Sequence, residues 1–576
     1  MEKKEKIFLV AFLAIIFLGQ FIIADRVIFG DDNIFSSFAK ENQFFFTKNA
    51  HTPLPVWIDI FLTEIFPLTN RTIRLTSIIF ATLTVGLVYI VGRRFFDKKT
   101  ALFATLFVGL SAWHIRASQM NSSSDGGIFT FFFLLTMYLL LLAMETKRTK
   151  YFVYTGLAFG VTMLCKESGI VLIPIAGFYY LIEQSTLFRK DKVEFFKTLG
   201  KHLFIIGVFS ALVFSVFPVL DILFNESQSI NAIFNRLDHA VGERPDPFSY
   251  GFAVLLPFSI FKLLIWMGPL FVFLPLLWLF QKDRLFTFKK KCGNLFFLLL
   301  FFVILFYLFV IPPTLDKTRY LLVLVPSFAL LCGAYLKTLH FSSKQWGVTL
   351  GVGVFFFLFF LFLNTSFTFA SYEAANNPLT KLMQFDTDFS VPLFTETDNS
   401  GFVMHFRVFL ITYVLSALAF LFLFFSDILV MERLQKYAPL VLILLLGVGG
   451  AFNLFIAEEY ALHWTSPNYS DAIKDLVTYA QENELKEPLY LLKNYELGFY
   501  LDDDYTQFES KYGLSMTNPA LIQEFKETLD SQGGTIIFTD MPFVAKDGAL
   551  WGAITSCRED LVLSDKGVDI GYVFIC

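Results

Sequence analysis

The chain has 576 residues, a mass of 66.0 kDa and a formal net charge of −4. Hydrophobic residues make up 55% of it, charged residues only 17%, and 76 residues are Phe, so the mean hydropathy is +0.60. These values exclude a disordered chain, a small disulfide-rich protein and a soluble nucleic-acid-binding protein, whose compositions are more polar or richer in cysteine. They predict a polytopic membrane protein that contacts membrane lipids and no nucleic acid.

Long apolar runs recur along the chain. A membrane-spanning helix needs about 20 mostly apolar residues. We expect 13 transmembrane helices, at 7–24, 75–91, 101–113, 128–144, 152–165, 170–182, 203–224, 252–280, 295–311, 321–335, 346–363, 408–425 and 439–456. The first run follows a Lys-rich start and no small-residue cleavage pattern follows it, so it is interpreted as an uncleaved anchor.

Charge alternates between the expected helices. The segments 1–6, 93–99, 145–150, 183–202, 281–293, 336–345 and 427–437 hold 24 Lys and Arg in 73 residues. The intervening loops are longer and poorer in Lys and Arg. Basic loops stay in the cytoplasm, so the pattern predicts a multi-pass protein of the plasma membrane with a cytoplasmic N-terminus. An odd number of helices then places the C-terminus outside the cell.

The composition changes after the last apolar run. Residues 457–576 carry 8 Lys and Arg against 21 Asp and Glu, a net charge of −13, whereas residues 1–456 carry +9. Helix patterns at 469–483 and 519–531 alternate there with strand patterns at 489–492 and 535–539. We therefore expect a membrane domain at 1–456 and an extracytoplasmic α/β domain at 457–576. Large outer loops are expected at 25–74, 225–250 and 364–407.

Two of the five cysteines, Cys557 and Cys576, fall in the expected outer domain. That compartment permits disulfides, so a bridge between them and a pair of free thiols both fit the sequence. The chain has no Cys-x-x-Cys motif and no His/Cys cluster of the kind that holds structural zinc.

Polar residues collect at the outer ends of the expected helices, within 29–33, 51–57, 111–126, 164–168 and 316–320. Charged residues near bilayer depth are costly and usually functional. A carboxylate can take the proton of an attacking hydroxyl, and cations can stabilise a departing phosphate. Such a set of side chains suits group transfer from a lipid-linked phosphate.

The order and spacing of several short motifs carry a resemblance to a known family. The motifs are Asp31-Asp32, His51-Thr-Pro-Leu54, Arg74-Leu75, Asp125, Leu164-Cys-Lys166 and Tyr320-Leu-Leu-Val-Leu-Val-Pro326. With them, nearly the whole chain resembles the GT-C superfamily of glycosyltransferases that use polyprenyl-phosphate sugars. Protein O-mannosyltransferases and the lipid A aminoarabinose transferase are the nearer comparison. The acidic pair is Asp-Asp rather than Asp-Glu, and Thr-Pro replaces Pro-Pro, so the substrate subfamily stays open.

The resemblance implies roles for three acids. Asp31 matches the acid that acts as general base or orients the acceptor, and Asp32 matches its neighbour, which helps hold the site. Asp125 matches an acid that supports the acceptor or the loop. The structural alternative for Asp31 and Asp125 is a helix N-cap, since Asp before an apolar helix is a favoured cap.

Four further residues are candidates for binding the donor phosphate or the substrate, namely His51, Lys166, Arg319 and Arg244. The last lies on an outer loop that would cover the donor. The structural alternatives are a backbone hydrogen bond for His51, an ion pair of Lys166 with Glu167, and an interfacial anchor for Arg319. The donor implied is a polyprenyl-phosphate sugar with no other cofactor, and a divalent metal is neither required nor excluded.

The first hypothesis is an inverting hexosyl- or pentosyltransferase of the membrane that acts on an acceptor protein, lipid or glycan at the outer face. The alternative is a transporter or lipid flippase without transferase activity, which would place charges near the bilayer midplane in broken helices. A membrane-anchored scaffold is a third hypothesis, and it has no need for acids and cations on one face.

Overall fold

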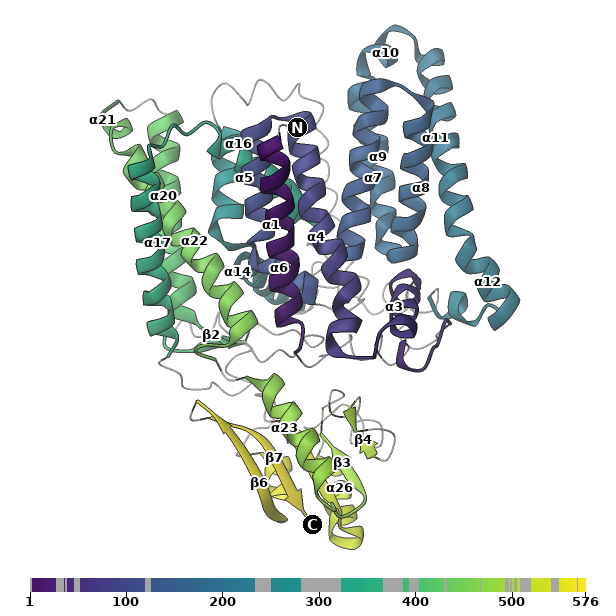
Figure 1. Cartoon of the computed structure of the whole chain (residues 1–576), viewed down its shortest axis with the longest axis vertical. Helices are drawn as coiled ribbons and strands as arrows, with labels where there is room; N and C mark the ends of the chain where they lie inside the picture. The colour runs from purple at the N-terminus through teal and green to yellow at the C-terminus, as the bar shows by residue number, and fades with distance from the viewer. Residues whose placement is uncertain are drawn as a thin grey trace. The chain divides into compact units, whose positions relative to one another are not determined.

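The structure is a computed structural model (Figure 1). It describes residues 3–26, 36, 39–45, 52–119, 126–233, 250–280, 323–365, 387–392, 403–428, 432–466, 468–492, 497, 500–501, 505–507, 519–539, 548–566 and 568–576. The chain packs into two compact units. The first is Met1–Ala24, Phe38–Phe356 and Tyr413–Ala457, and the second is Asp25–Ser37, Phe357–Thr412 and Glu458–Cys576.

The first unit consists of helices. In chain order they are α1 (Lys3–Ile23), α3 (Leu54–Ile65), α4 (Asn70–Phe95), α5 (Lys98–Gly109), α6 (Ala112–Gln119), α7 (Gly127–Thr146), α8 (Thr149–Cys165), a 3-10 turn (Glu167–Val171), α9 (Leu172–Glu183), α10 (Ser185–Lys190), α11 (Lys192–Phe214), α12 (Val216–Asn225), α14 (Tyr250–Phe280) and α16 (Val325–Leu336). The larger parts of α17 (Ser343–Asn364), α20 (Phe406–Ile428) and α22 (Ala438–Leu462) also belong to it, with the short α21 (Glu432–Gln435) between the last two.

Eight of the described helices are long and apolar enough to cross a membrane, or nine if the bent pair of α5 and α6 counts as one span. Each expected segment falls on a helix except 295–311, which lies outside the described residues. The chain is thus mostly helical, as predicted, whereas the count of 13 spans stays a prediction. The apolar window of α11 and α12 is only 6% buried and that of α17 only 11%, as expected of lipid-facing helices.

The expected helix at 101–113 is broken. Its two halves, α5 and α6, meet at an angle of 55°. The hydroxyl of Ser111 accepts a bond from the His114 amide, which begins a new helix. The side chain of Asn453 in α22 donates to the Leu110 carbonyl (2.7 Å) and accepts from the Ala112 amide (3.0 Å), so it replaces backbone bonds lost at the break.

Helix α14 is kinked at Gly268. This residue has a φ of +69°, which glycine adopts without the steric cost that a side chain would bring. The cause lies in the sequence, because Pro269 follows and a proline disfavours the helical conformation in the residue before it.

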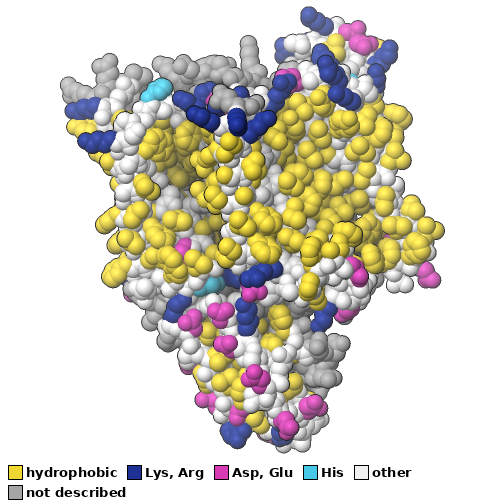
Figure 2. All heavy atoms as spheres, in the orientation of Figure 1, with side chains coloured by type: hydrophobic (Ala, Val, Ile, Leu, Met, Phe, Trp, Pro, Cys, Tyr) yellow, Lys and Arg dark blue, Asp and Glu magenta, His cyan; other side chains and the backbone are white. Residues whose placement is uncertain are grey.

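Ion pairs gather the expected inner segments on one face of the helical unit. The buried carboxylate of Glu5 pairs with Arg93 (3.3 Å), which joins the start of α1 to the end of α4. Two further pairs are Arg94 with Glu145 (2.8 Å) and Lys337 with Asp97 (2.5 Å). Figure 2 shows Lys and Arg side chains along the upper edge of the helical unit, above a broad hydrophobic band. We call this side the basic face.

The second unit contains a five-stranded sheet in the order β4-β3-β5-β7-β6. The strands are β3 (Leu489–Leu491), β4 (Tyr505–Gln507), β5 (Thr535–Thr539), β6 (Arg558–Asp565) and β7 (Val568–Ile575). Strand β3 runs parallel to β4 and β5, and β7 runs antiparallel to β5 and β6. The helices α23 (Tyr469–Glu482), α26 (Pro519–Gln532) and α27 (Ala549–Ile554) accompany it, and β1 (Ser390–Pro392) pairs with β2 (Val403–His405).

Both faces of the sheet are buried. Alternate residues of β5 point to opposite faces, so Ile536 and Phe538 pack with Phe525 of α26. Ile537 packs instead with Leu476 of α23. The expected helices and strands of 469–483, 489–492, 519–531 and 535–539 are confirmed to within a residue. Cys557 and Cys576 form a disulfide with a Cα–Cα distance of 4.6 Å, which resolves the open choice between bridge and free thiols.

Candidate active site

Most of the site residues predicted from the sequence lie outside the described residues. These are Asp31, Asp32, His51, Asp125, Arg244 and Arg319. Their roles stay predictions. Lys166 is described, and so are the residues that flank several of the motifs.

Lys166 ends helix α8. Its amide donates to the Thr162 carbonyl (3.0 Å), and its own carbonyl accepts from the Gly169 amide (3.0 Å), which starts the 3-10 turn. The residue is only 2% exposed. Lysine is almost never so deeply buried unless its charge has a partner, so the burial distinguishes Lys166 from a solvated lysine at the membrane edge.

Arg74, the arginine of the Arg-Leu motif, connects three helices. Its Nε donates to the Gln119 carbonyl at the end of α6 (2.8 Å), and one Nη donates to the Ala24 carbonyl after α1 (2.9 Å). The side chain of Gln119 in turn donates to the Gln20 carbonyl (2.9 Å). Arg74 lies in the second turn of α4, whose N-cap is Thr69. The arginine therefore fixes the ends of α1 and α6 against the start of α4.

His114 lies in α6, just after the bend. Its Nε2 is 2.8 Å from the Ala81 carbonyl, and its Nδ1 is 3.4 Å from the side-chain nitrogen of Gln20. A carbonyl only accepts, so Nε2 carries the proton and Nδ1 accepts from Gln20. The imidazole is consequently neutral and fully engaged in holding α6 on α1 and α4.

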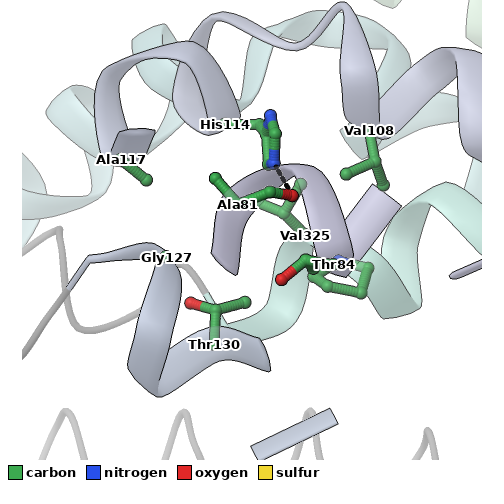
Figure 3. Close-up of a pocket in the computed structure, with 9 residues that line it drawn as sticks. Ala81, Thr84, Val108, His114, Ala117, Gly127, Thr130 and Val325 are labelled. Carbon is green, nitrogen blue, oxygen red and sulfur yellow. Dashed lines mark hydrogen bonds between the residues drawn. The ribbon is translucent and has the colours of Figure 1, made fainter. Parts of the chain in front are cut away.

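A small pocket lies beside His114 (Figure 3). Its lining comes from α4, α5, α6, α7 and α16, namely Ala81, Thr84, Val108, His114, Ala117, Gly127, Thr130, Val325 and Pro326. Pro326 ends the Tyr-Leu-Leu motif, and Gly127 follows Asp125 by two residues. Pro326 of one predicted motif and Gly127, which follows the position of the other in the sequence, thus both line this pocket. The space that it offers is about the size of one water molecule, and its walls are mainly apolar, so it does not fit a sugar.

Two buried contacts were not predicted from the sequence. Asp59 of α3 is fully buried and accepts a bond from the Thr76 hydroxyl (2.5 Å). The sequence did mark Asp59 as a candidate, because it is an acid inside the otherwise apolar stretch 54–62. The guanidinium of Arg116 lies 4.5 Å from the ring centre of Trp266, and both residues are buried. Nothing in the sequence marked Trp266 as a contact of Arg116, because a tryptophan is ordinary in an apolar run.

These polar residues share one end of the helical unit. Helix α4 begins near Arg74 and ends at the basic face, and α8 starts near that face and ends at Lys166. Arg74, Asp59, Arg116 and Lys166 therefore lie on the side away from the basic face. Among the described residues, no group of three or more His, Cys, Asp or Glu side chains has the arrangement of a metal site.

Comparisons with known proteins give a family match over part of the chain and a shared fold. Residues 50–218 match the family model described as dolichyl-phosphate-mannose-protein mannosyltransferase. No curated protein sequence matches the chain significantly. The structure resembles that of ArnT from Cupriavidus metallidurans bound to undecaprenyl phosphate, with a TM-score of 0.57, 16% identity and 98% of each chain covered.

Two other solved structures extend the comparison. The apo state of the same ArnT gives a TM-score of 0.55 at 16% identity, with 98% of this chain and 97% of that chain covered. An Archaeoglobus fulgidus oligosaccharyltransferase gives 0.48 at 12% identity, with 99% and 75% covered. At such identities the two ArnT structures establish a shared fold that extends over nearly the whole chain.

Proposed function

Because this chain has the GT-C fold, we propose that it is an inverting glycosyltransferase of the membrane, which moves one sugar from a polyprenyl-phosphate donor to an acceptor. The observation that carries the proposal is the group of buried polar residues Asp59, Arg74, Arg116 and Lys166 at one end of the helical unit. All four lie within the segment that matches the mannosyltransferase model. Ionisable side chains inside a membrane protein are functional by default.

In the proposed reaction Asp31 accepts the proton of an acceptor hydroxyl. The hydroxyl oxygen attacks the anomeric carbon from the side opposite the phosphate. The bond between that carbon and the phosphate oxygen breaks, and the polyprenyl phosphate leaves with the bonding electrons, so the configuration inverts. Lys166, His51 and Arg319 balance the negative charge of the departing phosphate.

Three further residues complete the proposed site. Asp32 helps hold it, Asp125 supports the acceptor, and Arg244 on the outer loop 225–250 covers the donor. The burial of Lys166 supports its place beside the phosphate, because a lysine in a dry site interacts with an anion more strongly than one in water.

The identity of the donor is supported by two of the comparisons. The description of the matching family model names dolichyl-phosphate mannose, and the ArnT structure contains undecaprenyl phosphate. Both are polyprenyl phosphates, which supports a polyprenyl-phosphate donor for this chain and leaves the sugar open. The acceptor is a protein, a lipid or a glycan on the outer face.

We also propose that the basic face is cytoplasmic and that residues 457–576 are extracytoplasmic. The positive-inside pattern of the described ion-paired segments supports this orientation. The disulfide between Cys557 and Cys576 supports it independently, because disulfides persist in oxidising compartments. The membrane domain then spans 1–456.

The rival function, a transporter or flippase, predicts broken helices. The break between α5 and α6 is such a feature, but the side chain of Asn453 satisfies its backbone groups. Lys166 caps the C-terminal end of α8 and Arg74 lies in the second turn of α4, and these positions near helix ends favour the transferase. The two functions differ in whether a covalent bond of the donor is broken.

The test is incubation of the purified protein with a panel of polyprenyl-phosphate sugars and candidate acceptors. Mass spectrometry then detects free polyprenyl phosphate and the glycosylated product. We expect Asp31→Asn to abolish product formation while donor binding persists. Glu145→Gln is the matched control, since Glu145 lies at the basic face in an exposed ion pair. Normal turnover of Asp31→Asn refutes the base, and movement of intact donor across vesicles without turnover supports the flippase.

A further inference from the structure

The second unit contains a buried hydrogen-bonded turn at the end of α22. Glu459 is fully buried and accepts four bonds, from the amides and hydroxyls of Thr465 and Ser466. The neighbouring Glu458 accepts from the Trp464 amide (3.1 Å). Two consecutive glutamates thus fold the chain after α22 back onto the helix end, with His463 at the corner in a left-handed conformation (φ 51°).

The ring of His463 joins this turn to Arg26. Nε2 of His463 lies 2.9 Å from a guanidinium nitrogen of Arg26, and Nδ1 lies 3.3 Å from the Ser466 hydroxyl. A guanidinium only donates, so Nε2 is the acceptor and the proton sits on Nδ1. Nδ1 then donates to Ser466, whose own hydroxyl donates to Glu459 (2.7 Å). Each ring nitrogen of His463 therefore has one defined role.

Arg26 makes two more contacts with the same helix end. Its other terminal nitrogen donates to the Tyr460 carbonyl, and its guanidinium carbon lies 4.7 Å from the centre of the Tyr460 ring. The residue before it is held as well, because Lys474 of α23 donates to the Asp25 carbonyl (2.7 Å). We call the contacts of Arg26 with Tyr460 and His463 the Arg26 socket.

The sheet secures the socket from the β6–β7 hairpin. Lys566, at the hairpin tip, donates to the carbonyls of His463 and Ser466, the latter at 2.7 Å. Asp565 accepts from the Asn468 amide (2.8 Å). The hairpin therefore holds the backbone of the turn that carries His463.

In the sequence, Arg26 lies at the start of the expected outer loop 25–74, which carries the acidic pair Asp31-Asp32. Five peptide steps separate Arg26 from Asp31, which spans at most about 18 Å when fully extended. We infer that the Arg26 socket positions the start of this loop, and that Arg26 and His463 are positioning residues for the general base. The inference rests on the proposed function of Asp31. It gives residues 458–576 a part in catalysis, since they build the socket.

The first test compares three variants by steady-state kinetics. Arg26→Lys keeps the charge but cannot donate to Tyr460 and His463 as a fork. His463→Leu removes the acceptor, and His463→Gln retains an uncharged oxygen that can accept from Arg26. We expect Arg26→Lys and His463→Leu to lower kcat about 100-fold, the usual effect of a small misplacement, with donor KM nearly unchanged. His463→Gln should retain most of the activity at pH 7.

The second test measures hydrogen exchange of the amides of 27–35 in the full-length protein. We expect faster exchange there in Arg26→Lys and in the milder Lys474→Ala, and wild-type exchange in the exposed control Lys526→Ala. Wild-type kcat, unchanged exchange in 27–35, or a rise spread evenly over α23 and the sheet overturns the inference. Asp31→Asn is assayed alongside. If it is fully active the proposed function fails, whereas an inactive Asp31→Asn with a normal Arg26→Lys refutes only the socket.

Discussion

The carboxylate of Asp59 in α3 accepts a hydrogen bond of 2.5 Å from the hydroxyl of Thr76 in α4, and both residues are almost fully buried. The bond joins α3 to α4, which carries the Arg-Leu motif in its second turn. A buried carboxylate relies on such donors, because the interior offers no water to replace them.

Thr76→Val tests this contact. The substitution keeps the shape of the side chain but removes the donor, and a buried acceptor that loses one bond costs about 1–3 kcal/mol. We expect a lower Tm in detergent and faster thermal inactivation. Thr63→Val in α3 is the control, since the Thr63 hydroxyl donates to the Ile60 carbonyl of its own helix. Equal effects of both substitutions contradict a special role for the Asp59–Thr76 bond.

Arg74→Lys tests the junction of α1, α4 and α6. Arg74 donates to the carbonyls of Gln119 and Ala24 from two different nitrogens, whereas a lysine has one. We expect a loss of about 1–3 kcal/mol in stability, read as a lower Tm, and a fall in kcat, because the ends of α1 and α6 are released. Arg71→Lys, on the exposed side of the same helix, is the control and should behave as wild type, because a lysine keeps a cation beside the Phe21 ring.

Removal of the disulfide tests the stability of the five-stranded sheet. Cys557 and Cys576 close a loop with a sequence separation of 19 residues, and cross-links of that size stabilise by about 3 kcal/mol. We expect reductant, or Cys557→Ser, to lower the unfolding temperature of the sheet, followed by the near-ultraviolet signal of Trp551. The free cysteines Cys165 and Cys332 are buried in the helical unit and serve as internal controls for alkylation. An unchanged transition in reductant would falsify the stabilising role.

Orientation is tested by cysteine labelling in intact cells. Lys147→Cys lies after α7 near the basic face, and Lys526→Cys lies on α26. We expect a membrane-impermeant maleimide to label the second and spare the first until the cells are opened. Labelling of both from outside would contradict the proposed topology.

The apolar runs and alternating charges predicted the helices and the basic face because both signals are local in sequence. An apolar run is visible in the sequence without knowledge of distant residues. Glu5, Arg93 and Glu145 each lie next to such a run, so their side of the membrane was predictable as well. The α/β pattern after residue 457 was readable for the same reason. The sequence showed only that a disulfide between Cys557 and Cys576 was possible. The register of β6 and β7 in the structure brings the two cysteines together.

The features that were not predicted depend on contacts between residues that lie far apart in the chain. Asn453 stabilises the break at Leu110, and His463 receives Arg26. No pattern in a single sequence connects such residues, so the break and the socket were not predicted. For the candidate site, the motifs predicted Lys166 as a site residue but did not predict that it is buried. Asp59 was overlooked, although an acid within an apolar stretch is a sign of function.

The pH dependence of stability provides the last prediction. Burial, then the nearby charges of Arg26 and Lys566, lowers the pKa of His463 well below its usual value. Glu459, through Ser466, and Glu458, through Trp464, are the acids on the same turn. In the unfolded chain His463 titrates near its ordinary pKa of about 6.5. Below that pH the unfolded state binds a proton on His463 that the folded state does not, so the contribution of His463 to stability falls as the pH falls.

The slope is about 1.4 kcal/mol per pH unit for one proton, between the unfolded pKa and the lowered folded pKa. We therefore expect the Tm of the wild type to fall from pH 7 to pH 5 by more than that of His463→Gln, which lacks the titrating ring yet can accept from Arg26. The measurement is thermal unfolding of both proteins in matched buffers. Parallel pH profiles for the two would show that the ring of His463 is not held neutral by Arg26 and Lys566.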